Sequence, residues 1–204
     1  MTAPVNQLWQ QILDLLQEHA PATAREIRPP APADDLLSLQ DIVGLPLPED
    51  LVAWWALMDG IVDRHDQRAG KLVPDAFVPL AVTRAREEYE RLFESTATDP
   101  TCCGPDQVHQ HPAGDDGNPF CSALVPICRD TTGATLCVDL RSGDNHGMIM
   151  TVAPGDGFSP THWGSVTEML TEIAERLEAY AHQAELPYGE QHPAVNDEGM
   201  LQWP

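Results

Sequence analysis

Apolar residues recur along the first part of the chain at spacings that predict helices. The segment 4–19 carries apolar residues three and four apart, which predicts an amphipathic helix that must bury one face. These apolar positions are Val5, Leu8, Trp9, Ile12, Leu13 and Leu16. The following stretch, 20–33, has four prolines and little apolar content, so it predicts a connector with at most one helical turn at 23–27.

Two short helices with clear start and stop signals are predicted next. Asp34 or Asp35 can cap a helix that Gly44 ends. Pro48 suits the first position of a second helix, since its missing N–H needs no partner there, and Gly60 stops this helix. The residues 77–80 then lead into a further helix at about 81–95.

The second half of the chain contains a block of strands followed by a long helix. Three apolar runs of strand length, 123–128, 134–140 and 147–153, are separated by short turn sequences and predict an antiparallel meander. Ser165 and Glu168 form a capping box at the start of a helix that runs to about residue 184. The apolar piece at 199–203 can add an edge strand.

This order of elements predicts one α+β fold. N-terminal helices precede a central antiparallel sheet, and a long C-terminal helix is expected to pack on that sheet. We expect an N-terminal helix and linker at 1–33, an α+β domain at 34–186 and a C-terminal tail at 187–204. The stretch 96–121 has almost no periodicity and predicts a long loop.

The net charge of the chain limits the kinds of molecule that it can bind. The chain has 11 basic and 32 acidic residues and a formal net charge of −21. Such a protein repels phosphate backbones and anionic membranes, so we expect neither as a partner. The same field attracts a basic protein and speeds its association. The alternative is that the acidity only keeps the protein in solution. We expect a monomer or a weak dimer.

Neither a membrane span nor a secretion signal is expected. No stretch approaches the roughly 20 apolar residues that a span requires, and the first residues lack a basic and then an unbroken apolar region. The five cysteines are an odd number, which favours reduced thiols. Both observations favour the cytoplasm.

Three segments, taken in order, resemble the SUKH superfamily, the Smi/Knr-type domain. They are VGLPLPEDLVAWWALMDG at 43–60, LVPICRDTTGATLCVDL at 124–140, and GMIMTVA at 147–153, which leads through Trp163 into the helix that begins after Ser165. The resemblance covers about residues 34–180. It implies an α+β fold and non-catalytic binding: many bacterial members are immunity proteins that neutralise secreted toxins, often nucleases, and the fungal namesake regulates cell-wall synthesis.

Catalytic and cofactor motifs are not apparent in the sequence. It has no G-x-S-x-G nucleophile turn, no G-x-G-x-x-G and no P-loop. Cysteine and histidine residues within 96–121 could hold zinc, but their spacing fits no usual zinc site. These residues are Cys102, Cys103, His109, His111 and Cys121. We therefore expect no cofactor, no metal and no enzymatic activity, and we keep a small metal-dependent enzyme as the remote alternative.

The candidate partner-binding residues are tryptophans and aspartates. Adjacent tryptophans face about 100° apart on a helix, so one is expected in the core and the other half exposed as a binding anchor. The aspartates at strand ends and turns could form an acidic lip, or could simply shape the turns. The candidates are Trp54, Trp55, Asp59, Asp130, Asp139, Asp144, Asp156 and Trp163.

These observations lead to two functional hypotheses. The first is an immunity-type inhibitor that binds a basic toxin or nuclease domain and occludes its nucleic-acid-binding face. The second is a regulatory or scaffold protein with an endogenous partner.

Overall fold

The computed structural model describes residues 4–62, 71–96, 111–117, 120–186 and 192–203. The helices in these residues are α1 (Val5–His19), α2 (Pro21–Glu26), α3 (Ala33–Val43), α4 (Glu49–Trp55), α5 (Val82–Thr96) and α6 (Val166–His182), with a 3-10 turn η1 (Pro74–Ala76). The strands are β1 (Val78–Pro79), β2 (Leu124–Arg129), β3 (Thr135–Asp139), β4 (Ile149–Ala153), β5 (Gly157–Pro160), β6 (Ala194–Val195) and β7 (Leu201–Gln202). The α+β class is therefore confirmed.

The main sheet of the described residues is antiparallel throughout and has the order β1-β2-β3-β4-β5. The predicted meander forms its centre, and β1 and β5 extend it by one strand at each edge. Pro126 lies inside β2, where a proline cannot donate to a neighbouring strand. The pairing of β2 with β3 shifts between Pro126 and Cys128, and this irregularity accommodates the proline.

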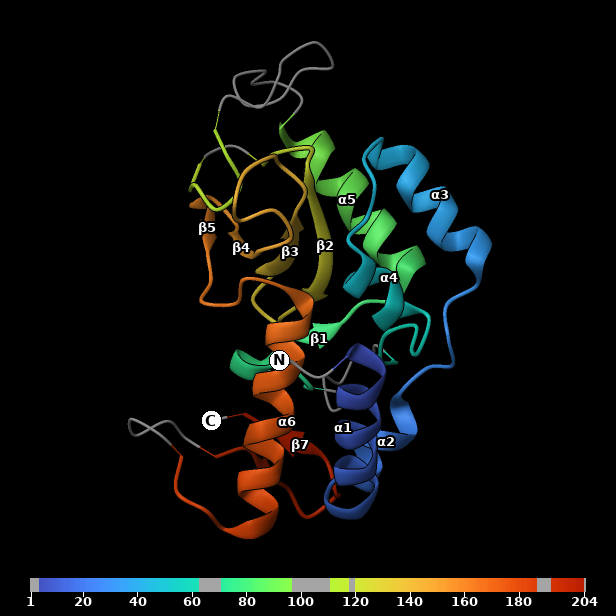
Figure 1. Cartoon of the computed structure of the whole chain (residues 1–204), viewed down its shortest axis with the longest axis vertical. Helices are drawn as coiled ribbons and strands as arrows, with labels where there is room; N and C mark the ends of the chain where they lie inside the picture. Colours follow the sequence, from blue (N-terminus) through green and yellow to red (C-terminus); the bar gives the residue numbers. More distant parts are fainter. Residues whose placement is uncertain (1–3, 63–70, 97–110, 118–119, 187–191, 204) are drawn as a thin grey trace.

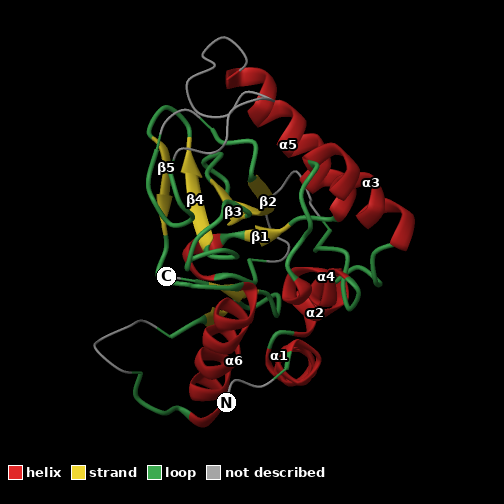
Figure 2. Ribbon diagram, turned by 45° about the horizontal axis from the view of Figure 1, so that its top comes forward, coloured by secondary structure: helices red, strands yellow, loops and turns green. Residues whose placement is uncertain are grey.

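The helices form two groups around the sheet. Figure 1 and Figure 2 both place α5 between the sheet and α3, and α5 packs on β2 while α3 packs on α5. A second group lies at one end of the sheet, where α6 runs along α1, and α4 contacts both. One hydrophobic cluster joins the two groups, and it includes Trp9 of α1 and Trp203 near the C-terminus.

Local sequence explains the helix ends. The backbone N–H of Glu168 donates to the Ser165 hydroxyl (3.1 Å), as the capping box predicts. The Glu168 carboxylate reaches back one residue further than expected, to the N–H of Gly164 (2.7 Å). Gly44 ends α3 in the left-handed conformation, with φ 71°.

Two predicted details are wrong. Asp34 and Asp35 do not cap α3: Pro32 holds the cap position, and both aspartates lie in the first turn. The piece 199–203 does not extend the main sheet, because β7 pairs with β6 in a separate hairpin. In addition, the sequence did not predict β1, a strand of only two residues.

Candidate functional site

Both tryptophans of α4 are buried, so the expectation that one is half exposed is wrong. Trp54 is 0% and Trp55 1% exposed. The reason is that α4 is enclosed on more than one side. It contacts α1 and α6, and the Trp55 indole N–H donates to the Leu80 carbonyl, on the connection between β1 and α5, at 3.2 Å. Neither side chain reaches the surface of this fold as a binding anchor.

Asp59 and Trp163 have internal partners. The Asp59 carboxylate accepts a hydrogen bond from the Val82 N–H at 2.7 Å and so caps α5 from a distant segment. Gly60 has a positive φ of 72°, and a Cβ there would lie 2.4 Å from the Ala81 nitrogen, so only glycine fits. The Trp163 indole N–H donates to Glu172 of α6 at 2.6 Å.

The four aspartates proposed for an acidic lip do not form one. Successive turns of a meander lie at opposite ends of its strands, so the turns that carry Asp130 and Asp156 lie at one end and the one that carries Asp144 at the other. Asp130 accepts hydrogen bonds from its own turn, at Thr132 and Ala134. Asp139 is fully buried, whereas Asp144 and Asp156 are exposed.

Asp139 forms a buried ion pair with Arg141. Their side chains are 0% and 2% exposed, and the closest N···O distance is 2.7 Å. Asp139 also accepts from the Gly114 N–H at 3.0 Å, and Arg141 donates to the Asp115 carbonyl at 2.7 Å. The pair thus ties the segment 111–117 to the end of β3.

Two of the five candidate metal ligands, His111 and Cys121, lie within the described residues. Cys102, Cys103 and His109 lie outside the described residues. His111 is exposed, whereas Cys121 is fully buried. Within the residues that the structure describes, no group of three His, Cys, Asp or Glu side chains could hold a metal ion.

Two of the packed helices, α3 and α5, carry exposed apolar side chains. In the described part of the chain, the large apolar residues that are exposed are Leu37 (58%) and Ile42 (38%) of α3 and Phe93 (44%) of α5. Asp34, Leu37 and Asp41 follow one another at spacings of three and four, so they share the outer stripe of α3. These five residues are called the α3–α5 surface below.

A cleft on the other side of α5 is lined by basic residues. It has a volume of about 710 Å³ and lies between β1, the start of α5 and the β2–β3 turn. Five of the chain's eleven Lys and Arg residues line it, with three carboxylates, of Glu87, Glu88 and Asp130. The five cationic residues are Arg28, Lys71, Arg84, Arg91 and Arg129.

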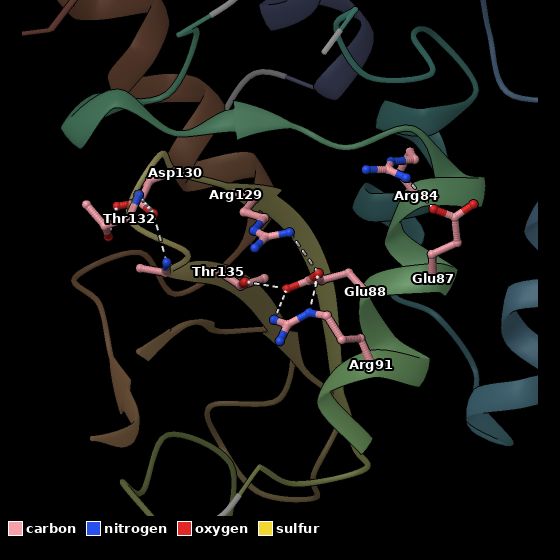
Figure 3. A network of polar contacts seen from close by, with 9 residues as sticks. Arg84, Glu87, Glu88, Arg91, Arg129, Asp130, Thr132 and Thr135 are labelled. Carbon is pink, nitrogen blue, oxygen red and sulfur yellow. Dashed lines mark hydrogen bonds and ion pairs between the residues drawn. The ribbon is translucent and has the colours of Figure 1, made fainter. Parts of the chain in front are cut away.

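Glu88 connects α5 to β2 and β3 through a network of polar contacts (Figure 3). Its side chain is 6% exposed, and its carboxylate pairs with Arg91 at 2.5 Å and with Arg129 at 3.3 Å. The Thr135 hydroxyl also donates to it, at 3.1 Å. Burial alone would raise the pKa of Glu88, but the hydrogen bond from Arg91 and the charge of Arg129 outweigh burial and lower it.

The sequence contained a signal for half of this network. Arg84, Glu87, Glu88 and Arg91 recur at the helical spacing of three and four residues, which places them on one face of α5. Arg129 gave no such signal, because it lies 41 residues from Glu88 and reaches it only through the packing of β2 on α5.

Comparisons of the chain with models of known protein families and with curated proteins find no match. Among the residues that the structure describes, no helix combines the length and the apolar character needed to cross a bilayer.

Proposed function

We propose that this protein is a non-catalytic binding domain that holds a basic protein partner against the α3–α5 surface. The observation that carries the proposal is that the exposed large apolar side chains of the described residues lie on two packed helices, and that one of them, Leu37, shares the outer stripe of α3 with Asp34 and Asp41. An apolar centre with charged side chains at its rim is the usual anatomy of a protein interface. Leu37, 58% exposed between Asp34 and Asp41, is the expected anchor.

Internal pairing of the cations supports the choice of a basic partner. Within the described residues, Arg28, Arg84, Arg86, Arg91, Arg129, Arg141 and Arg176 each pair with a carboxylate of the same chain. Among the described residues, Asp34 and Asp41 of the α3–α5 surface have no ion-pair partner. The excess negative charge is thus left for solvent and for a partner, and it can steer a basic protein toward this face.

The finer proposal is an immunity-type inhibitor. The partner is then a basic toxin or nuclease domain, and the mechanism is occlusion: carboxylates on this chain take the place of substrate phosphates on the partner's binding face. The resemblance to the SUKH superfamily supports this choice, together with the net charge of −21.

An affinity capture with a matched variant tests the proposal. Wild-type protein and the variant Leu37→Ser are used as baits in extracts of the cells that make the protein, at low salt. We expect one basic protein that wild type retains, that Leu37→Ser loses and that added salt releases. Because Leu37 is exposed, its replacement changes folding stability by no more than about 0.5 kcal/mol, which thermal melting checks.

The identity of the captured protein separates the two functional hypotheses. A toxin or nuclease domain supports inhibition, whereas a resident regulatory protein overturns the immunity assignment and leaves the binding domain in place. Equal retention of every protein by both baits would contradict the α3–α5 surface as the binding site.

A further inference from the structure

We propose that the cation-lined cleft is a second binding site, which takes a small phosphorylated molecule of nucleotide size. It lies on the opposite side of α5 from α3, and it is built from β1, α5 and the β2–β3 turn. Five cations and three carboxylates line this one cleft, so its lining has a positive formal charge in a chain whose net charge is −21. Anionic ligands bind where such a positive lining is enclosed.

The ion pairs of Glu88 hold two of these cations in place. Two guanidinium groups share a single buried carboxylate, so the trio of Arg91, Glu88 and Arg129 keeps one net positive charge. The side chains of Arg91 and Arg129 remain 49% and 41% exposed, while that of Glu88 is 6% exposed. The carboxylate therefore holds both arginines in the lining of the cleft, while a large part of each side chain stays exposed.

Arginine is the side chain best suited to phosphate. Its planar group presents five N–H donors, and Arg91 uses its Nε and one terminal nitrogen on Glu88. The remaining donors of the two arginines can reach phosphate oxygens, which accept from several directions at once. Lys71 adds positive charge on the same lining, and Arg84, at the start of α5, adds a further guanidinium group, which pairs with Glu87 there.

The rest of the lining suits the organic part of such a ligand. Apolar side chains from the segment 78–81, together with Ile61 and Val62, make up much of the wall. The volume of about 710 Å³ is within the range of sites for molecules of drug or cofactor size. A free inorganic ion would leave this apolar wall uncovered.

The overall charge argues for a small molecule over a polymer. A nucleic acid strand would extend beyond the cleft onto a surface whose net charge is strongly negative, and each further phosphate would be repelled. A ligand contained within the cleft meets a lining in which five cations outnumber three carboxylates.

Calorimetric titration of the full chain tests this assignment with four probes: adenosine monophosphate, pyrophosphate, inorganic phosphate and uncharged adenosine. We expect adenosine monophosphate to bind with a Kd below about 1 mM, and adenosine not to bind. Arg129→Gln and Arg84→Gln should each weaken binding about tenfold, the usual loss for a charge-assisted hydrogen bond. Arg84 is 55% exposed, so its variant keeps the test valid if Arg129→Gln unfolds.

Arg86→Gln is the matched control, because Arg86 lies on the same helix and pairs with Glu90 but does not line the cleft. It should bind as wild type does. The assignment is overturned if no phosphorylated probe binds, if adenosine binds as well as its monophosphate, or if Arg86→Gln weakens binding as much as the two cleft variants. Preferential binding of a phosphopeptide would overturn the choice of a small molecule.

Discussion

At the scale of single residues, Asp139 and Glu88 are buried carboxylates that pair with arginines in different surroundings. Asp139 and Arg141 are both buried, so their charges are neutralised away from water. Glu88 is buried, but its arginines are partly open to solvent. The two sites therefore respond differently to the loss of the carboxylate.

Replacing Asp139 with asparagine should destabilise the fold by about 3–5 kcal/mol, because it leaves the Arg141 charge buried without a counterion. Urea unfolding followed by tryptophan fluorescence measures this change. Asp144→Asn is the control, since Asp144 is exposed in the turn that follows, and its effect should stay within about 0.5 kcal/mol. Equal effects of the two substitutions would show that the buried pair does not stabilise the fold.

Glu88→Gln should lower the free energy of unfolding by about 2 kcal/mol at neutral pH, which is the usual contribution of hydrogen bonds to a charged group. The folded pKa of Glu88 is lowered from its ordinary 4.5, so the ionised form stabilises the fold above that value. This contribution is lost as the pH falls through the lowered pKa. The difference in unfolding free energy between wild type and variant should therefore shrink below about pH 4.5; a constant difference down to pH 2.5 would contradict it.

Sequence patterns predicted the roles of single residues less well than they predicted the helices and strands. The roles of Asp59 and Asp139 depend on partners that the fold supplies: the Val82 N–H lies 23 residues from Asp59, and the Gly114 N–H lies 25 residues from Asp139. The prediction that one tryptophan of α4 is half exposed was wrong for a related reason. A helical projection assumes one buried face, whereas α4 is covered by α1, by α6 and by the segment at Leu80.

At the scale of elements, the sequence predicted a helix end or a strand correctly wherever the residues that specify it are close together in the chain. The capping box at Ser165, the glycine after α3 and the three apolar strands all appear as predicted. The two-residue β1 and the four-residue β5 were not predicted, because strands this short depend on the neighbours that pair with them.

Ser165→Ala tests the strongest of these local signals. It removes the hydroxyl that accepts from Glu168, so we expect a loss of about 1 kcal/mol in the free energy of unfolding. Thermal and urea unfolding measure it. Ser142→Ala, at an exposed turn position, serves as the control and should leave stability unchanged. A cap that costs nothing to remove would mean that packing alone fixes the start of α6.

At the scale of the whole molecule, the distribution of charge matters more than its total. The net charge of −21 follows from the sequence, but the sequence could not predict which carboxylate each cation pairs with or which cations line the cleft. Both depend on contacts between distant segments, such as the one that brings Arg129 to Glu88 across 41 residues. In the folded chain, α5 has the cation-lined cleft on one side and α3 on the other.

The central claim is that local charge on the α3–α5 surface, and not acidity in general, guides a basic partner. Two double variants with the same net charge separate these possibilities: Asp34→Asn with Asp41→Asn on that surface, and Asp144→Asn with Asp156→Asn on exposed turns of the sheet. The decisive measurement is the association rate of each with the captured partner, at low and at high salt.

We predict that the first double variant associates several-fold more slowly than the second at low salt, and that about 0.5 M salt removes this difference by screening. Equal rates for the two double variants, or a wild-type rate that does not change with salt, would contradict the claim.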